Sequence, residues 1–185
     1  MADPDLVLLE ATGRGDGDAF EALVKRYQSP LLNFIARYVG DRSAAEDLTQ
    51  EVFFRVYRAA PRFEARAKVS TWIFQIAYNL ALTEMDRRRR QERLCVAFLA
   101  GGEIAGGPVT HPEQGHELEE EITSALGGLP QNQRAALLLR INEEMSYREI
   151  GEVLGVSIQS VESLLFRARE SLRRSLGRKR QETKK

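Results

Sequence analysis

This chain of 185 residues has little of the chemistry that catalytic or metal-binding proteins use. Its one cysteine, Cys95, excludes a disulfide framework and a cysteine-rich metal site, and we expect this thiol to be a small apolar filler. The two histidines, His111 and His116, lack a partner at metal-ligand spacing, and we expect both to be solvated. No nucleophile–base set, metal cluster or phosphate-binding loop is visible. The sequence therefore predicts no enzyme, no catalytic residue, no metal site and no cofactor.

Long apolar runs are also missing. No stretch approaches the roughly 18 consecutive apolar residues that indicate a membrane-spanning helix. No signal peptide or lipidation motif is visible either. We therefore expect a soluble cytoplasmic protein without membrane insertion.

The formal net charge of the whole chain is zero, but its segments are charged. The formal net charge is −3 over residues 1–61, +4 over 62–93, −6 over 94–128 and +5 over 129–185. Contact with phosphate groups depends on local rather than total charge. Two basic segments separated by an acidic one therefore favour nucleic acid as a partner.

Apolar residues recur at helical spacing almost everywhere outside the acidic segment. Glycine and proline crowd into residues 101–112, which is typical of a linker. The sequence predicts an all-α protein with two small, separately folded helical domains, residues 1–93 and 117–180, joined by a flexible acidic linker over 94–116. The expected helices are residues 4–12, a helix capped by Asp18, a restart at Pro30 that ends at Gly40, a helix opened by Ser43 that ends near Ala60, a helix capped by Ser70 that runs to about Arg90, and helices from Glu117 to Gly127 and from Pro130 to Leu139.

A helix-turn-helix pattern fills residues 146–172. Ser146 can cap the first helix, with Glu149 at the capping-box position three residues later. Gly155 tolerates the left-handed backbone of a sharp turn, and Ser157 can cap the second helix. The spacing predicts an inward face made of Val161, Leu165, Ala168 and Leu172 and an outward face made of Gln159, Ser160, Glu162 and Ser163.

That outward face lies at the start of the second helix, where a DNA-binding helix-turn-helix contacts base edges in the major groove. An ordinary antiparallel helix pair is the alternative interpretation of the same spacing. Arg167, Arg169 and the basic residues between Arg178 and Lys185 favour nucleic acid.

The other basic segment combines cations with aromatic rings. Arg66 and Lys68 precede a helix that carries Trp72, Tyr78 and Asn79 and is expected to end in four arginines at 87–90. Such a mixture suits single-stranded nucleic acid, because bases stack on rings while cations hold phosphates. The alternative is that Trp72, Ile76 and Leu80 form a core face, and that the arginines favour a helix C-terminus through its dipole.

Four stretches in order carry a family resemblance: residues 45–53, residues 70–77 with the arginine run, Leu129–Pro130, and the helix-turn-helix. Together they resemble a bacterial RNA polymerase sigma factor of the extracytoplasmic-function (ECF) group. The resemblance covers nearly the whole chain and is weakest over 94–116. It implies a promoter-specificity subunit that binds core RNA polymerase, recognises promoter DNA and assists strand opening.

The resemblance also implies three sets of site residues. A core-polymerase-binding set would comprise Asp47, Gln50, Glu51, Phe54 and Arg55. A set that captures a flipped base of the minus-ten element and holds nearby backbone would comprise Arg62, Phe63, Arg66, Lys68, Ser70, Thr71, Asn79, Arg87, Arg88, Arg89 and Arg90. A set that reads the minus-thirty-five element would comprise Arg148, Ser157, Gln159, Ser160, Glu162, Ser163, Arg167 and Arg169.

The partners that the resemblance implies are the clamp helices of the polymerase largest subunit, the flap of the second-largest subunit, promoter DNA in duplex and single-stranded form, and an anti-sigma factor. Family members commonly carry lysine and arginine where this chain has Glu162 and Leu164, so phosphate attraction is weaker here. Glu162 can instead accept a hydrogen bond from a cytosine amino group, and Leu164 is a candidate core residue. The competing functional hypothesis is a dimeric helix-turn-helix regulator that acts without polymerase.

Overall fold

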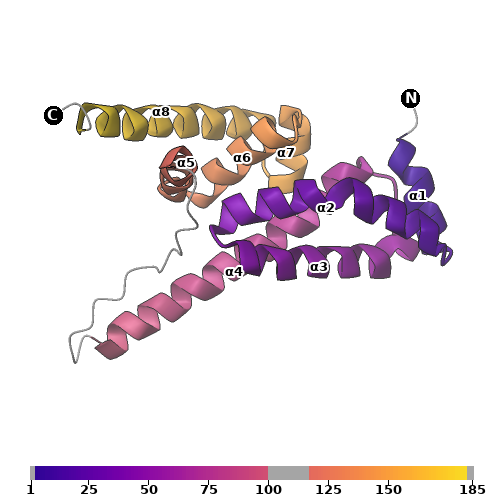
Figure 1. Cartoon of the computed structure of the whole chain (residues 1–185). Helices are drawn as coiled ribbons and strands as arrows, with labels where there is room; N and C mark the ends of the chain where they lie inside the picture. The colour runs from indigo at the N-terminus through magenta and orange to yellow at the C-terminus, as the bar shows by residue number, and fades with distance from the viewer. Residues whose placement is uncertain (1–2, 100–116, 183–185) are drawn as a thin grey trace.

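A computed structural model describes residues 3–99 and 117–182, and every regular element within those ranges is a helix (Figure 1). The elements are α1 (Pro4–Gly13), α2 (Gly17–Val39), α3 (Arg42–Ala59), a 3-10 turn η1 (Ala60–Arg62), α4 (Val69–Leu99), α5 (Glu117–Gly127), α6 (Gln131–Asn142), α7 (Tyr147–Leu154) and α8 (Ile158–Glu182). Helices α1–α4 form an N-terminal unit and α5–α8 a C-terminal unit. The predicted all-α class is confirmed.

The core of the N-terminal unit lies where α2, α3 and α4 meet. Leu23, Phe34 and Val52 are fully buried there, and the rings of Phe34 and Phe74 meet edge to face with centroids 5.6 Å apart. A left-handed backbone at Gly40, with φ of 76°, ends α2 and lets α3 fold back along it. Burial of these rings and aliphatic groups is the main force that holds α4 against α2 and α3.

Two helix starts differ from the sequence prediction. Asp16 caps α2 by accepting from the Ala19 amide at 3.0 Å, and Asp41 caps α3 by accepting from the Ala44 amide at 3.0 Å. Asp18 and Ser43, the caps predicted from the sequence, each lie two residues further along the chain. An aspartate is as good a cap as serine, and in each case the earlier candidate forms the cap.

Pro30 does not restart a helix but lies inside a continuous α2. A proline in a helix interior removes one backbone hydrogen bond and costs about 3 kcal/mol. Residues buried on both sides of it, among them Tyr27, Leu31 and Phe34, hold the helix together and offset that cost. The predicted break was wrong because tertiary burial outweighs the local signal.

Helix α4 is longer than predicted at both ends. It begins at Val69, so Ser70 lies in its first turn and is not its cap, and it continues past Arg90 to Leu99. The first six residues of the predicted linker are therefore helical. Cys95 is exposed on this extension, so the expectation of an apolar filler was wrong. Residues 100–116, with both histidines and most of the predicted linker, lie outside the described residues.

The predicted helix-turn-helix is confirmed as α7 and α8. The Ser146 amide donates to Glu149 at 2.8 Å and the Glu149 amide donates to the Ser146 hydroxyl at 3.3 Å, which completes the capping box. Gly155 ends α7 in the left-handed conformation with φ of 67°, and the Ser160 amide donates to Ser157 at 3.2 Å. The predicted inward face is buried at Val161, Leu165 and Ala168 and half-buried at Leu172.

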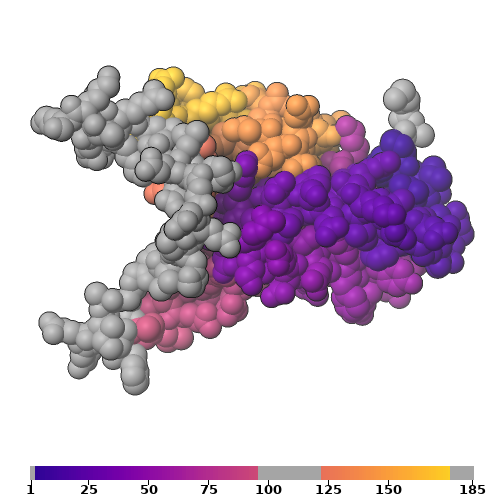
Figure 2. Space-filling model, viewed as in Figure 1, coloured from indigo at the N-terminus to yellow at the C-terminus, as the bar shows by residue number. Residues whose placement is uncertain are grey.

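The two units pack against each other, as the space-filling view in Figure 2 shows, and their buried residues form one continuous cluster. The buried guanidinium of Arg134 on α6 donates to the Tyr38 carbonyl of α2 at 2.7 Å and also to the carbonyls of Gly127 and Leu129. The Tyr78 hydroxyl of α4 donates to Asn132 at 2.9 Å. Separately folded domains were expected from the sequence, whereas the structure joins the two units through both buried apolar residues and polar side chains.

Candidate nucleic-acid interface

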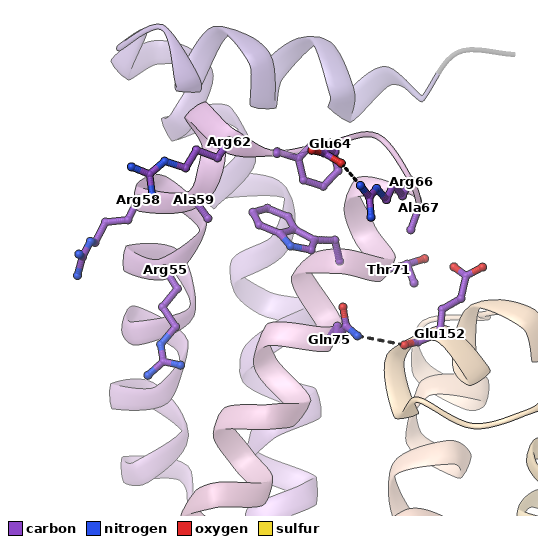
Figure 3. A pocket seen from close by; sticks show the side chains of 12 residues that line it. Arg55, Arg58, Ala59, Arg62, Glu64, Arg66, Ala67, Thr71, Gln75 and Glu152 are labelled. Atoms are coloured by element: carbon purple, nitrogen blue, oxygen red, sulfur yellow. Dashed lines mark hydrogen bonds and ion pairs between the residues drawn. The ribbon is translucent and has the colours of Figure 1, made fainter.

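A cleft of about 840 Å³ opens between the end of α3, the start of α4 and α7 (Figure 3). Four arginines line it, and Glu152 of α7 contributes from the C-terminal unit. The Gln75 side chain donates to the Glu152 carbonyl at 3.3 Å across this boundary. The lining is Arg55, Arg58, Ala59, Arg62, Phe63, Glu64, Arg66, Ala67, Thr71, Trp72, Gln75 and Glu152. A mostly cationic cleft with aromatic rings fits a nucleotide better than an apolar ligand.

The aromatic part of the cleft is a ring pair at the start of α4. Phe63 and Trp72 are both half-buried, with ring centroids 4.7 Å apart and planes tilted by 55°. The expected core face of Trp72, Ile76 and Leu80 is only partly confirmed, since Leu80 alone of the three is buried. The fully buried face of α4 lies one position further along, at Ile73, Phe74, Ala77 and Ala81.

The residues expected to capture a flipped base are not all exposed to solvent. Arg62, Arg66, Lys68 and Asn79 are exposed, and Arg66 pairs with Glu64. Ser70 is half-buried. Thr71 is 2% exposed, and its hydroxyl has no hydrogen-bond partner.

The Lys68 ammonium forms an ion pair with Glu149 of α7 at 2.6 Å. Burial alone would raise the pKa of Glu149, but hydrogen bonds from Lys68 and Ser146 outweigh it and hold the pKa at about 2. The same carboxylate completes the capping box at the start of α7. A cation expected to contact DNA is therefore held by the C-terminal unit.

The four consecutive arginines of α4, residues 87–90, have different surroundings. Arg88 is half-buried and donates to Asp41 at 2.8 Å and to Glu84 at 2.7 Å, so it ties α4 to the start of α3. Arg87 also pairs with Glu84, whereas Arg89 and Arg90 are exposed. The alternative explanation of this run by the helix dipole is wrong, because α4 continues for nine residues beyond it.

Glu84 should make stability depend on pH. The hydrogen bond from Arg87, opposed by burial and aided by Arg88, lowers the pKa of Glu84 from 4.5 to about 2. A carboxyl with a depressed folded-state pKa stabilises the fold fully above its unfolded value, and this stabilisation disappears as pH falls from about 4.5 to 2. We expect Glu84→Gln to lower the free energy of unfolding at pH 7 by about 1 kcal/mol and to reduce its slope between these pH values.

Denaturant titrations at pH 7, 4.5 and 3 measure this effect. Glu46→Gln is the control, because the Glu46 side chain is 57% exposed in its pair with Arg42. An equal pH slope in the Glu84→Gln and wild-type proteins would contradict the assignment.

A second surface lies on the outer side of α3. Asp47, Gln50, Phe54 and Arg55 are exposed on one stripe, with Glu51 half-buried among them. Phe54 is 55% exposed, and the Arg58 guanidinium lies 5.5 Å from its ring centroid. Two further members of this stripe, the 47%-exposed Tyr57 and Arg58, were not predicted from the sequence. They lie three and four residues after Phe54, and this helical spacing could have identified them.

A third surface is the start of α8 with α7 beside it. All eight residues expected to read duplex DNA are exposed: Arg148, Ser157, Gln159, Ser160, Glu162, Ser163, Arg167 and Arg169. Leu164 is half-buried and packs on the core, which agrees with its assignment as a candidate core residue. Phe166, 68% exposed on the same helix, was not foreseen as a surface residue.

Metal binding and membrane crossing have no support within the described ranges. No group of three or more His, Cys, Asp or Glu side chains among those residues could hold a metal ion. Likewise, no helix in residues 3–99 or 117–182 is long and apolar enough to span a membrane.

Comparison with known proteins gives one consistent picture. Residues 23–91 match the family described as Sigma-70 region 2, and residues 119–172 match Sigma-70, region 4. The chain is 33% identical to the RNA polymerase sigma-H factor of Pseudomonas aeruginosa, over 94% of each chain. It is 33% identical to the ECF RNA polymerase sigma-E factor of Escherichia coli, over 91% of this chain and 92% of the relative. The solved structure of CnrH in complex with the cytosolic domain of CnrY is similar with a TM-score of 0.69 and 27% identity, over 94% of this chain and 97% of that one.

Proposed function

This chain belongs to the ECF group of RNA polymerase sigma factors, and we propose on that basis that it is a promoter-specificity subunit. It binds core RNA polymerase, recognises promoter DNA and assists strand opening. The observation that carries the proposal is that one chain displays three exposed surfaces in the order a sigma factor needs: the α3 stripe, the cationic cleft with its loop, and the start of α8. They lie within the two matched regions.

The α3 stripe is the proposed polymerase contact. Exposed carboxylate and amide groups at Asp47 and Gln50 lie beside the exposed ring of Phe54. A partly charged, partly apolar helix face suits a partner surface of similar composition, with the aromatic ring as the buried anchor. The partner surface is the clamp helices of the largest subunit.

The loop between η1 and α4 is the proposed minus-ten contact. Stacking on a ring contributes about 1–3 kcal/mol per base, and the Phe63–Trp72 pair presents rings beside exposed cations. Arg62 and Arg66 supply positive charge at the mouth of the cleft, which suits the phosphates of an unpaired strand. Asn79 lies exposed on α4, about three turns beyond the loop.

The start of α8 is the proposed minus-thirty-five contact. Gln159, Ser160 and Ser163 present amide and hydroxyl groups at the end of the helix that enters the major groove. Glu162 supplies an acceptor for a cytosine amino group, and Arg167 and Arg169 supply phosphate contacts further along. The C-terminal unit also meets the flap of the second-largest subunit.

An anti-sigma factor is the third proposed partner. The similar structure of CnrH was solved with a bound protein segment, the cytosolic domain of CnrY. Such a partner would act here by covering the polymerase-binding and DNA-binding surfaces. The packing of α7 beside the base-capture loop, with Lys68 held by Glu149, is an arrangement that it could stabilise.

The protein acts by binding and catalyses no reaction of its own, and it works in the cytoplasm, where core polymerase meets the chromosome. The alternative of a polymerase-independent dimeric regulator is not favoured. Matches to sigma factors extend along almost the whole chain, whereas a conventional regulator would need only the helix-turn-helix part.

Run-off transcription with purified core polymerase tests the proposed function. Adding this protein should direct core polymerase to specific start sites in a promoter library from the native host. Absence of stimulated transcription on every promoter in the library would contradict the proposal. Sedimentation of the free protein with duplex DNA separates the alternative, which requires a dimer on a two-fold symmetric site.

Phe54→Ala should weaken binding to core polymerase about tenfold, because a central exposed aromatic commonly contributes more than 1 kcal/mol to an interface. Fluorescence titration of labelled core enzyme measures the dissociation constant. Val7→Ala is the control, since Val7 is an apolar residue on α1 that is 65% exposed and lies away from the α3 stripe. Equal affinities for the two variants would remove Phe54 from the proposed contact.

A further inference from the structure

The 62–69 loop runs from the last residue of η1 to the first residue of α4, and helix α1 lies across it. In Figure 3 its ribbon, which ends at the grey N-terminal trace, passes over Glu64, Arg66 and Ala67. The helix has ten residues and is therefore about 15 Å long. It contacts η1 and α4, which are the two ends of the loop.

One end of α1 meets the start of the loop. A Cβ atom added at Gly13 would lie 3.0 Å from the Ala60 carbonyl oxygen and 3.2 Å from the Cα of Pro61. A side chain at Gly13 would push the two backbones apart by a few tenths of an ångström, so glycine favours their close approach. The C-terminal end of α1 is therefore fixed against η1.

The other end of α1 meets the end of the loop through Asp3. One carboxylate oxygen of Asp3 accepts from the Asp5 amide at 3.1 Å and caps α1 itself. The second oxygen accepts from the Val69 amide at 2.8 Å, 66 residues along the chain. Val69 is the first residue of α4, and Lys68 before it has no side-chain acceptor with which to cap the helix. Asp3 thus supplies one cap to each of two helices.

Asp5 holds α1 in the orientation that this double cap requires. Its carboxylate is 7% exposed and accepts hydrogen bonds from Arg26 and from the Tyr27 hydroxyl, both on α2. Burial and the negative charge of Asp3 raise the pKa of Tyr27 to about 12, so its hydroxyl remains a donor at neutral pH. The N-terminal turn of α1 is thereby anchored to the body of the unit.

We propose that Asp3 is a positioning residue for strand opening: through its double cap, α1 braces the 62–69 loop in the shape that captures an unpaired base. The inference rests on the proposed function of that loop. Asp3 itself touches no nucleic acid in this scheme. It fixes the point at which the loop becomes helix, one residue after Lys68 and three before Trp72.

Asp3→Asn separates this role from ordinary helix capping. Asparagine and aspartate are equally good N-caps, so either can cap α1. In Asp3 the two amides bind different carboxylate oxygens, and in asparagine one of these positions becomes an NH2 group, which donates and cannot accept, so one of the two contacts is lost. Asp16→Asn is the matched control, because Asp16 caps only α2, where asparagine is a full replacement.

With holoenzyme assembled from core polymerase, we expect Asp3→Asn to weaken binding of a single-stranded non-template minus-ten oligonucleotide about fivefold, the equivalent of one lost cap. Affinity for core polymerase and for minus-thirty-five duplex should remain at wild-type values. Trp72, the only tryptophan in the chain, gives a second signal: its emission should shift in Asp3→Asn and not in Asp16→Asn.

Three outcomes decide the matter. Selective loss of oligonucleotide binding with a shifted Trp72 emission supports the brace. Wild-type binding by Asp3→Asn overturns the proposal. An equal loss of affinity for the minus-ten oligonucleotide, core polymerase and the minus-thirty-five duplex overturns it as well. If wild-type holoenzyme binds no minus-ten oligonucleotide and opens no promoter, the proposed function of the loop fails instead.

Discussion

Replacing Gly151 with leucine should destabilise the helix-turn-helix by about 3 kcal/mol and abolish minus-thirty-five binding, because a side chain there has no room. A Cβ atom added at Gly151 would lie 2.8 Å from the carbonyl oxygen of Val156 and 3.7 Å from the side chain of Val161. The first of these atoms is backbone in the turn, where the Val156 amide also donates back to the Gly151 carbonyl at 3.0 Å. The turn must therefore open to accept a side chain, and α8 moves with it.

A graded series makes this result specific. Gly151→Ala places the same Cβ atom 2.8 Å from the Val156 carbonyl oxygen, so it should also destabilise the turn, but by less than leucine, because a gain of up to about 1 kcal/mol in helix propensity offsets part of the cost. Gly17→Leu is the matched control, since no atom lies within 4 Å of a Cβ added at Gly17. Thermal unfolding and titration with minus-thirty-five duplex measure the two effects. Comparable stability of Gly151→Leu and Gly17→Leu would contradict the close packing at this turn.

Arg134→Ala should cost about 3–5 kcal/mol of stability and separate the two units, because Arg134 is a buried cation shared between them. Its side chain is 6% exposed and donates to carbonyls of Tyr38, Gly127 and Leu129. Removal leaves three carbonyls without this donor, and hydrogen bonds to a charged group contribute about 1.5–3 kcal/mol each. Burial lowers the pKa of Arg134, but the guanidinium stays protonated at neutral pH.

Two further variants test the geometry of the hydrogen bonds that the Arg134 guanidinium donates. Arg134→Lys should not restore stability, because a single ammonium cannot reach carbonyls on both sides. Arg37→Ala is the control at the same boundary: Arg37 reaches Asn142 of the C-terminal unit at 3.2 Å, but the bond is exposed and should contribute less than about 1 kcal/mol. Denaturant unfolding gives the energies, and small-angle scattering reports separation. An increase in radius for Arg37→Ala but not for Arg134→Ala would show that the wrong contact was chosen.

Local signals predicted most of the fold. The capping box at Ser146, the left-handed Gly155 and the inward spacing of Val161 and Leu165 each depend on neighbours within one or two turns, and all are confirmed. The errors arose where distant groups decide. Pro30 stays helical because buried neighbours hold α2 together, and α4 starts at Val69, where Asp3 supplies the cap.

The candidate site was predictable as a set of surfaces but not as an arrangement. Exposure of Phe54 and Gln159 follows from their positions on amphipathic helices. Nothing in the sequence pairs Lys68 with Glu149, since such a contact depends on how two units meet. The capping of both α1 and α4 by Asp3 was not predicted for the same reason, because Asp3 and Val69 are far apart in the sequence and form no local pattern.

The Lys68–Glu149 pair changes how salt should affect promoter binding. An exposed lysine that meets a phosphate releases the cation condensed on the DNA and adds about one unit to the salt slope of binding. The Lys68–Glu149 ion pair must first break, and the free Glu149 carboxylate then attracts cations from solution. The step exchanges one anionic partner for another, so Lys68 should add less to the slope than the exposed Arg62 at the other end of the loop. Ionic strength would then govern the opening of the two units as well as the grip on the promoter.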